Sequence, residues 1–256
     1  MIRREESWDG FWAKLLRIDM FEGQWEAYRK VADSRAEWLE KTFGLQKDRP
    51  VLSLACGEGG IELALARRGY SVIGIDRSQV MISFARDMAI EENLNATFVH
   101  ADLTTDSQLP GNNGTVLCFD TLGLLNDDDE YRIIQRAVGS LHRDGVLLVD
   151  NPLREGLATS HRWQRINDGY FLSESFLDKE SGTHVLNPIF ISQDGEEVLL
   201  RDPYDRKRES HTGVLRYVYN PSELVNLVKT TQLPAREVKH QRPGYYMVVG
   251  SRRLEE

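Results

Sequence analysis

The chain has 256 residues, with 32 Lys and Arg against 40 Asp and Glu, so its formal net charge is −8. Hydrophobic residues make up 41% and charged residues 28%, a balance typical of soluble globular proteins that excludes an intrinsically disordered chain. No apolar run approaches the roughly 18–20 residues that a membrane-spanning helix needs, and the charged opening residues lack the apolar core of a secretory signal. Only Cys56 and Cys118 are present, which excludes a disulfide-rich scaffold and favours a cytoplasmic location.

Residues 1–45 are expected to form a helical cap. Trp8, Phe11 and Trp12 recur at helical spacing, and a second apolar stripe runs from Trp25 to Phe43. Two interpretations stay open. The aromatic side chains either dock this cap onto the main core or line a pocket.

From Pro50 onward, strands and helices alternate. Short apolar strands are expected at 51–55, 71–75, 96–100, 115–119 and 146–149, with amphipathic helices between them. Near-continuous apolar strands joined by helices indicate a parallel sheet that is covered on both faces. Residues 46–153 therefore predict a doubly wound α/β domain.

Residues 154–219 break this alternation and predict a small antiparallel β insertion. Its strands are expected at 170–177, 183–192, 197–201 and 213–219, with a hairpin turn at Asp194-Gly195. The main domain resumes over residues 220–256. There Asn220 and Glu223 form the capping pattern of a helix, and two further strands are expected at 236–240 and 245–250.

A glycine-rich turn follows the first strand of the α/β domain. Small residues at Ala55, Gly57 and Gly59 let a ligand approach the backbone, next to the free N–H groups of a helix N-terminus. Asp76 ends the second strand, where a carboxylate can accept hydrogen bonds from both hydroxyls of a ribose. Glu62 stands where a dinucleotide fingerprint needs its third glycine, and no P-loop motif occurs. The pattern predicts a ligand that contains adenosine.

This turn resembles motif I of the class I S-adenosylmethionine-dependent methyltransferases, and residues 46–151 and 220–251 follow that family in order. Asp76 matches the family's ribose-binding acid, and Asp102-Leu103 matches its adenine-contacting pair. The resemblance implies a seven-stranded, mostly parallel sheet in the order 3-2-1-4-5-7-6 and S-adenosylmethionine as cofactor. The cofactor contacts that it implies are Ser53, Ala55, Cys56, Gly57, Gly59, Asp76, Arg77, Met81, Asp102, Leu103 and Phe119.

Two features concern the methionine end of the cofactor. Ser53 stands where the family usually has an acidic residue, so an aspartate there is expected to tighten binding. In the N-terminal cap, Tyr28 is expected to reach the methionine end, with Arg29 as a partner for its carboxylate. The alternative for Tyr28 is a core position within the cap.

The predicted activity is methyl transfer to a nitrogen or oxygen atom of a small molecule, with the insertion as a lid over the substrate. No catalytic residue is assigned, because no base stands out, although Phe119, Asp120 and Asn151 end strands on the expected rim of the site. The six histidines lack metal-ligand spacing, so no metal is expected. A monomer or homodimer is expected.

Three other functions stay open. Ser53 keeps open a non-catalytic protein that binds S-adenosylmethionine, whereas Glu62 disfavours a nicotinamide-dependent oxidoreductase. A nucleic-acid methyltransferase would need a basic face, and the acidic chain offers only the cluster Arg206-Lys-Arg208. We therefore expect neither a nucleic-acid partner nor a membrane partner.

Overall fold

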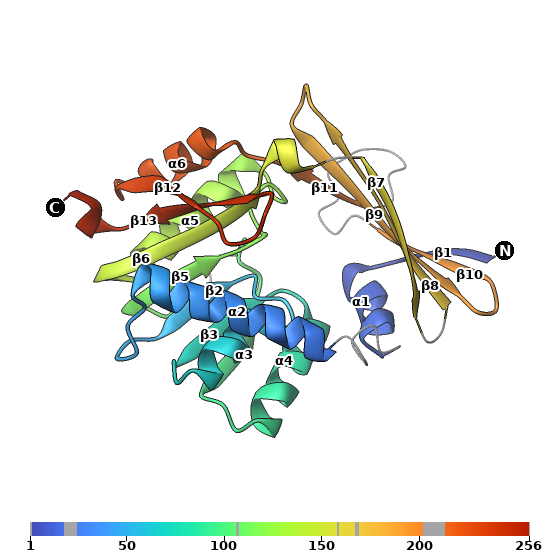
Figure 1. Cartoon of the computed structure of the whole chain (residues 1–256), viewed down its shortest axis with the longest axis horizontal. Helices are drawn as coiled ribbons and strands as arrows, with labels where there is room; N and C mark the ends of the chain where they lie inside the picture. The colour runs from blue at the N-terminus through green and yellow to red at the C-terminus, as the bar shows by residue number, and fades with distance from the viewer. Residues whose placement is uncertain are drawn as a thin grey trace.

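The computed structural model describes residues 2–17, 25–105, 108–157, 159–166, 169–201 and 213–255. These residues form a seven-stranded and a six-stranded sheet, which lie in two parts of the molecule on either side of helix α1 (Trp8–Arg17) (Figure 1). Within the described residues, no helix combines the length and apolar character needed to cross a bilayer.

The seven-stranded sheet has the order β12-β13-β6-β5-β2-β3-β4. Strand β13 pairs antiparallel with both β12 and β6, and the remaining pairs are parallel. Numbered along the chain within this sheet, the order is 3-2-1-4-5-7-6, which confirms the prediction. The bounds are β2 (Val51–Leu54), β3 (Val72–Asp76), β4 (Ala96–His100), β5 (Asn113–Cys118), β6 (Leu141–Pro152), β12 (Ala235–Lys239) and β13 (Tyr245–Gly250).

Helices cover both faces of this sheet. Side chains of α2 (Trp25–Phe43), α3 (Gly60–Arg67) and α4 (Gln79–Glu91) pack on one face. Those of α5 (Asp127–Ser140) and α6 (Pro221–Lys229) pack on the other (Figure 1).

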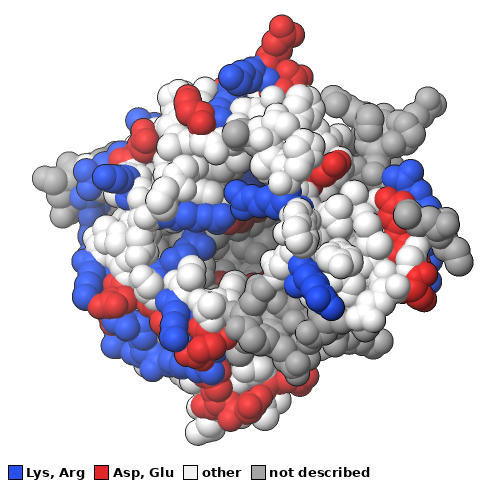
Figure 2. Space-filling view, turned by 45° about the vertical axis from the view of Figure 1, so that its right-hand side comes forward, with Lys and Arg blue, Asp and Glu red and all other residues white. Residues whose placement is uncertain are grey.

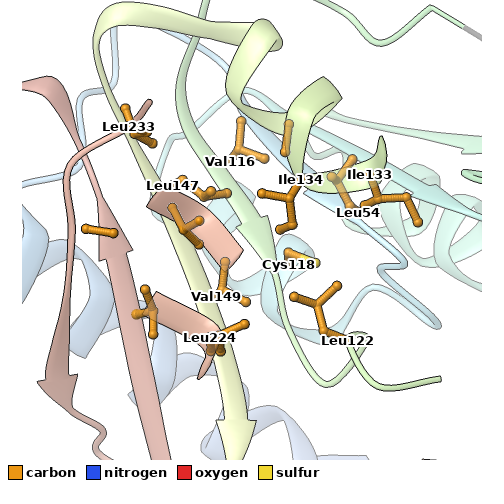
Figure 3. Close-up of a cluster of buried hydrophobic side chains, with 14 of the residues drawn as sticks. Leu54, Val116, Cys118, Leu122, Ile133, Ile134, Leu147, Val149, Leu224 and Leu233 are labelled. Carbon is orange, nitrogen blue, oxygen red and sulfur yellow. The ribbon is translucent and has the colours of Figure 1, made fainter. Parts of the chain in front are cut away.

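The side chains of successive residues along the central strands pack on opposite faces of the sheet. In β5, Leu117 belongs to the cluster under α2 and α3, whereas Val116 and Cys118 point toward Ile134 of α5 (Figure 3). All of these side chains are fully buried. The near-continuous apolar strands of the sequence are thus explained by burial on both faces.

The six-stranded sheet has the order β1-β10-β9-β8-β7, with β11 paired to β9. It contains the expected insertion strands and two that the sequence did not predict, β7 (Ser160–Ile166) and β1 (Ile2–Glu6). The charged loop at 202–209, with its basic cluster, lies outside the described residues. The other bounds are β8 (Gly169–Asp178), β9 (Thr183–Ser192), β10 (Glu196–Leu200) and β11 (Val214–Tyr217).

The start of the chain departs from the expected helical cap. Residues 2–6 form strand β1, which pairs in parallel with β10, from Ile2 opposite Glu196 to Glu6 opposite Leu200. Helix α1 begins only at Trp8. The pairing joins segments that are distant in sequence, so local periodicity carries no signal of it. Helix α2 instead packs on the seven-stranded sheet through side chains including Ala36.

Helix α1 packs against the inner face of the six-stranded sheet. Phe11 is 1% exposed and lies in a cluster with Phe190 of β9 and Val198 of β10. Trp8 and Trp12 pack at the edge of this cluster, with ring centroids 5.6 Å apart. Phe11 therefore docks the helix on the sheet, while Trp8 and Trp12 remain partly exposed beside this cluster.

Candidate active site

A cavity of about 350 Å³ lies at the carboxyl ends of the strands of the seven-stranded sheet, where β2 and β5 run side by side. This is the switch point of strand order, the position at which open α/β sheets bind their ligands. Eight of the predicted cofactor residues line the cavity: Ala55, Gly57, Asp76, Arg77, Met81, Asp102, Leu103 and Phe119. Its other lining residues are Trp8, Trp12, Glu58, Thr104, Asp120, Thr121, Leu124, Leu125 and Ile133.

The glycine-rich turn forms one wall of this cavity. Ala55 and Gly57 have φ values of 54° and 55°, in the left-handed region. A Cβ added at Gly57 would meet no atom within 4 Å, and because Gly57 lines the cavity, that Cβ would point into free space. The backbone N–H of Gly57 donates to Asp76 Oδ2 at 2.9 Å. The turn thus fits a ligand that passes close to the backbone.

Two carboxylates of the cavity lining, those of Asp76 and Asp102, are fixed by hydrogen bonds. Asp76 also accepts the Ser78 backbone N–H at 2.8 Å, and burial raises the pKa of its carboxyl despite these hydrogen bonds. Asp102 accepts hydrogen bonds from the backbone N–H and the hydroxyl of Thr104, both at 2.8 Å. Burial acts to raise the pKa of Asp102, but the bonds from Thr104 and the charge of Arg77 outweigh it, and the pKa is lowered.

Two predicted residues lie behind the turn and do not line the cavity. Cys56 packs against the cluster around Phe98, and burial raises the pKa of its thiol well above the usual range. A Cβ at Gly59 would lie 2.7 Å from the Phe98 ring, so this position requires glycine for packing. Both residues pack on the buried side of the turn, against Phe98.

Ser53 does not line the cavity either. Its side chain hydrogen-bonds Glu62, a residue of the first turn of α3 that is 4% exposed. Burial raises the pKa of Glu62 to about 7, although the bond with Ser53 opposes this. A carboxyl group is therefore present beside Ser53, supplied by the helix and not by the strand.

Tyr28 reaches the turn from α2. Its hydroxyl donates a hydrogen bond to the carboxylate of Glu58, which lines the cavity, while Tyr28 itself does not. Burial and the charge of Glu58 raise the pKa of Tyr28. Arg29 lies elsewhere, with Nη2 3.5 Å from Glu92, so it is not positioned as a carboxylate partner in the cavity.

The cation of α2 that faces the site is Arg35, which the sequence analysis missed. Its Nη2 donates to Asp150 Oδ2 at 2.9 Å, and its guanidinium lies 5.3 Å from the ring centroid of Phe119. Arg35 follows Tyr28 by seven residues, a spacing that places both on one helix face. This spacing was the signal available in the sequence.

Asp120 follows β5 on the cavity wall. Its φ is 52°, a strained value for a non-glycine residue of the kind that concentrates at functional sites. Its carboxylate accepts the Tyr245 hydroxyl at 3.0 Å and pairs with Arg216 at 3.2 Å and Arg242 at 3.4 Å. Burial acts to raise the pKa of Asp120, but the two arginines outweigh it, and the pKa is lowered. Asp120 is therefore an ionised acceptor in the cavity.

Helix α1 covers the cavity from the side of the six-stranded sheet. Trp8 and Trp12 line it, and between them Asp9 Oδ1 accepts the hydroxyl of Ser78 at 2.6 Å. Ser78 is the N-cap of α4, and its backbone N–H is already bound to Asp76. The Asp9–Ser78 contact thus ties the cover to the same short segment that holds Asp76.

The comparisons with known proteins agree with this architecture. Residues 51–145 match the family model of a methyltransferase domain. The "Putative methyltransferase YqeM" of Bacillus subtilis (strain 168) is 28% identical over 185 residues, which cover 70% of this chain and 71% of that protein. The rRNA methyltransferase RlmD of Shewanella woodyi is 37% identical over 82 residues, which cover 32% of this chain and 18% of that enzyme.

A solved structure reproduces the fold over nearly the whole chain. S-adenosylmethionine-bound CalS10, an amino pentose methyltransferase from Micromonospora echinaspora, aligns with a TM-score of 0.65 and 16% identity, over 94% of this chain and 96% of that chain. The strand order and the turn held to Asp76 are those of the class I S-adenosylmethionine-dependent methyltransferase fold. Residues 51–145 match the methyltransferase-domain family, and the chain as a whole is similar to methyltransferases.

Proposed function

We propose that this protein transfers a methyl group from S-adenosylmethionine to a nitrogen or oxygen atom of a small polar molecule. The supporting observation is that one cavity joins Asp76 and Asp102 to Asp120 beneath Trp8 and Trp12. The first two acids lie at the cofactor end. Asp120 lies at the end where a small acceptor would bind.

The chain's own residues suit the cofactor. Asp76 would accept the ribose hydroxyls, since Gly57 and Ser78 hold its carboxylate in place. Asp102 and Leu103 would contact the adenine, and Arg35 would approach the methionine end from α2. When bound, the cofactor supplies a methyl group on a positively charged sulfur.

Asp120 would orient the acceptor. Because its pKa is lowered, it accepts a hydrogen bond from an N–H or O–H group but is a weak base at neutral pH. An acceptor that is nucleophilic without prior loss of a proton, such as a neutral amine, therefore suits this site. Trp8 and Trp12 would exclude water and keep the reacting atoms aligned.

The relatives support this proposal to different degrees. CalS10 is described as an amino pentose methyltransferase, which is consistent with a small amine acceptor. The similarity to an rRNA methyltransferase is confined to 32% of this chain, so it does not favour a nucleic-acid substrate. We further propose that residues 154–219, together with β1, act as the substrate lid.

The experiment measures S-adenosylhomocysteine formation by the purified protein with S-adenosylmethionine and a panel of small amines and hydroxylated compounds. Ribosomal RNA serves as the comparison substrate. We expect turnover with amines, reduced in Asp120→Ala while cofactor affinity is retained. Turnover with RNA alone would refute the proposal, and so would tight cofactor binding without turnover of any acceptor, which would identify a non-catalytic binding protein.

A further inference from the structure

Positively charged side chains gather around a hollow on the face shown in Figure 2. Arg216 and Arg242 both form ion pairs with the carboxylate of Asp120, which lines the cavity. The same carboxylate also accepts the Tyr245 hydroxyl. At this corner of the cavity, the N–H donors of the arginines therefore exceed the acceptors that the described residues provide.

Arg216 is held firmly but incompletely satisfied. It lies on β11 of the six-stranded sheet, with Nε bound to the Leu122 carbonyl at 3.1 Å and Nη1 to Asp120 Oδ1 at 3.2 Å. Its side chain is 12% exposed, and Nη2 is buried without a hydrogen-bond partner among the described residues. A buried cationic donor without an acceptor is costly, so such a group is expected to meet one in the working state.

A second unpaired nitrogen lies on the neighbouring strand. His184 of β9 is directly opposite Arg216 in the sheet, and its Nε2 is buried without a partner in the described part of the chain. Burial and the charge of Arg216 lower the pKa of His184, so its ring is neutral and can donate from one nitrogen. Both side chains project from the same face of the sheet, because directly opposed residues share a face.

We infer that Arg216 and His184, with Arg242 beside them, form a subsite for an oxyanion group of the acceptor substrate, a carboxylate or a phosphate ester. This inference rests on the proposed function, because it assigns the position of the acceptor. Guanidinium groups match both anions in shape and charge. An anion bound there would lie next to Asp120 and leave the substrate's amine or hydroxyl free to donate to that carboxylate.

The test uses the full-length protein saturated with S-adenosylhomocysteine, so that the carboxylate position of the cofactor is already filled. Sodium phosphate and sodium acetate are titrated separately at constant ionic strength and followed by calorimetry. We expect one anion to bind per chain, and the tighter of the two identifies the class of oxyanion. Arg216→Met should weaken this binding by about tenfold or more.

Two further variants make the result decisive. Arg242→Met changes a half-exposed side chain and should also weaken anion binding, in case Arg216→Met does not fold. Arg236→Met removes a positive charge from an exposed position of β12 and should change nothing. Equal anion affinity in the wild type and both site variants, or no anion binding at all, overturns the inference. Failure of the wild type to bind S-adenosylhomocysteine would instead refute the proposed function.

Discussion

The backbone N–H of Asp120 donates to the carboxylate of Asp150, with Asp120 N and Asp150 Oδ1 2.7 Å apart. Asp150 is fully buried at the end of β6, and its other oxygen accepts Arg35. The buried carboxylate of Asp150 at the end of β6 therefore links Arg35 of α2 to Asp120 on the cavity wall. The conformation of Asp120 depends on this link.

Replacing Asp150 by alanine should destabilise the protein and reduce methyl transfer. The change leaves the Arg35 guanidinium without its partner in a largely buried position, at a cost of about 3 kcal/mol. Asp150→Asn keeps an oxygen for the Asp120 N–H and should retain more activity. Urea unfolding and S-adenosylhomocysteine formation measure the two effects. Equal activity in the alanine and asparagine variants would contradict the role given to the Asp120 hydrogen bond.

Gly57→Ala should weaken cofactor binding through a methyl group that points into the cavity. The control is Gly44→Ala, because Gly44 has φ 58° against 55° for Gly57 and also has no atom within 4 Å of an added Cβ. Both variants carry a similar backbone strain of about 1 kcal/mol. Titration with S-adenosylhomocysteine should show a large loss of affinity for Gly57→Ala only. A matching loss in both would place the cofactor elsewhere.

Stability should fall as the pH rises through the range in which Glu62 loses its proton. The pKa of Glu62 is about 7 in the folded chain against 4.5 ordinarily, so between these values the folded state binds more protons than the unfolded state. The free energy of unfolding should therefore be lower by on the order of 3 kcal/mol above pH 7 than below pH 4.5. Glu62→Gln should remove this dependence in urea unfolding curves, whereas Glu91→Gln, at an exposed position, should leave it intact.

The hydrogen bond between Ser53 and Glu62 leads to a different expectation for Ser53→Asp from the one drawn from the sequence. An aspartate at position 53 would lie against the buried carboxyl of Glu62, and two like charges at this distance raise each other's pKa. We expect lower stability at pH 8 and weaker cofactor binding. The double variant Ser53→Asp with Glu62→Gln removes the repulsion and should recover both. Tighter binding by the single variant would support the expectation drawn from the sequence.

Asp9→Ala should loosen the cover formed by α1. Loss of the hydrogen bond from Ser78 is expected to weaken cofactor binding by roughly two- to tenfold, since Trp8 and Trp12 would be held less firmly. Glu5→Ala is the control, because Glu5 forms an exposed ion pair with Arg201 and does not line the cavity. Cofactor titration and the rate of tryptic cleavage compare the two. If Asp9→Ala behaves as Glu5→Ala does, α1 serves packing alone.

Much of the seven-stranded sheet was predictable, because its signals are local. Apolar strands separated by helices, the glycine turn and Asp76 lie within one continuous stretch, and the structure places most of the predicted cofactor residues on one cavity. The insertion strands on either side of Asp194-Gly195 were also predictable, since Gly195 adopts a positive φ in the expected turn. In both cases neighbouring residues determine the conformation.

The polar network around Asp120 was not predictable. Arg216 and Arg242 come from segments far along the chain. Arg216 reaches Asp120 from β11 of the other sheet, and Arg242 reaches it from the connection between β12 and β13. Strand β1 was not predicted, because its charged sequence becomes a strand only by pairing with β10, which is distant in the chain. From the sequence, Glu62 was only the residue in place of a third glycine, because its burial and its hydrogen bond with Ser53 depend on tertiary packing.

The parallel pairing of β1 with β10 has a consequence for the order in which the molecule assembles. The segment from Val51 to Pro152 can form its strands and crossover helices from neighbouring parts of the chain, whereas β1 must wait until Leu200 has been synthesised. Helix α1 directly follows β1, so the cover over the cavity is completed late. A nascent chain stalled before residue 196 would carry the paired strands β2 to β6 with the cofactor cavity exposed, before α6, β12 and β13 have been made.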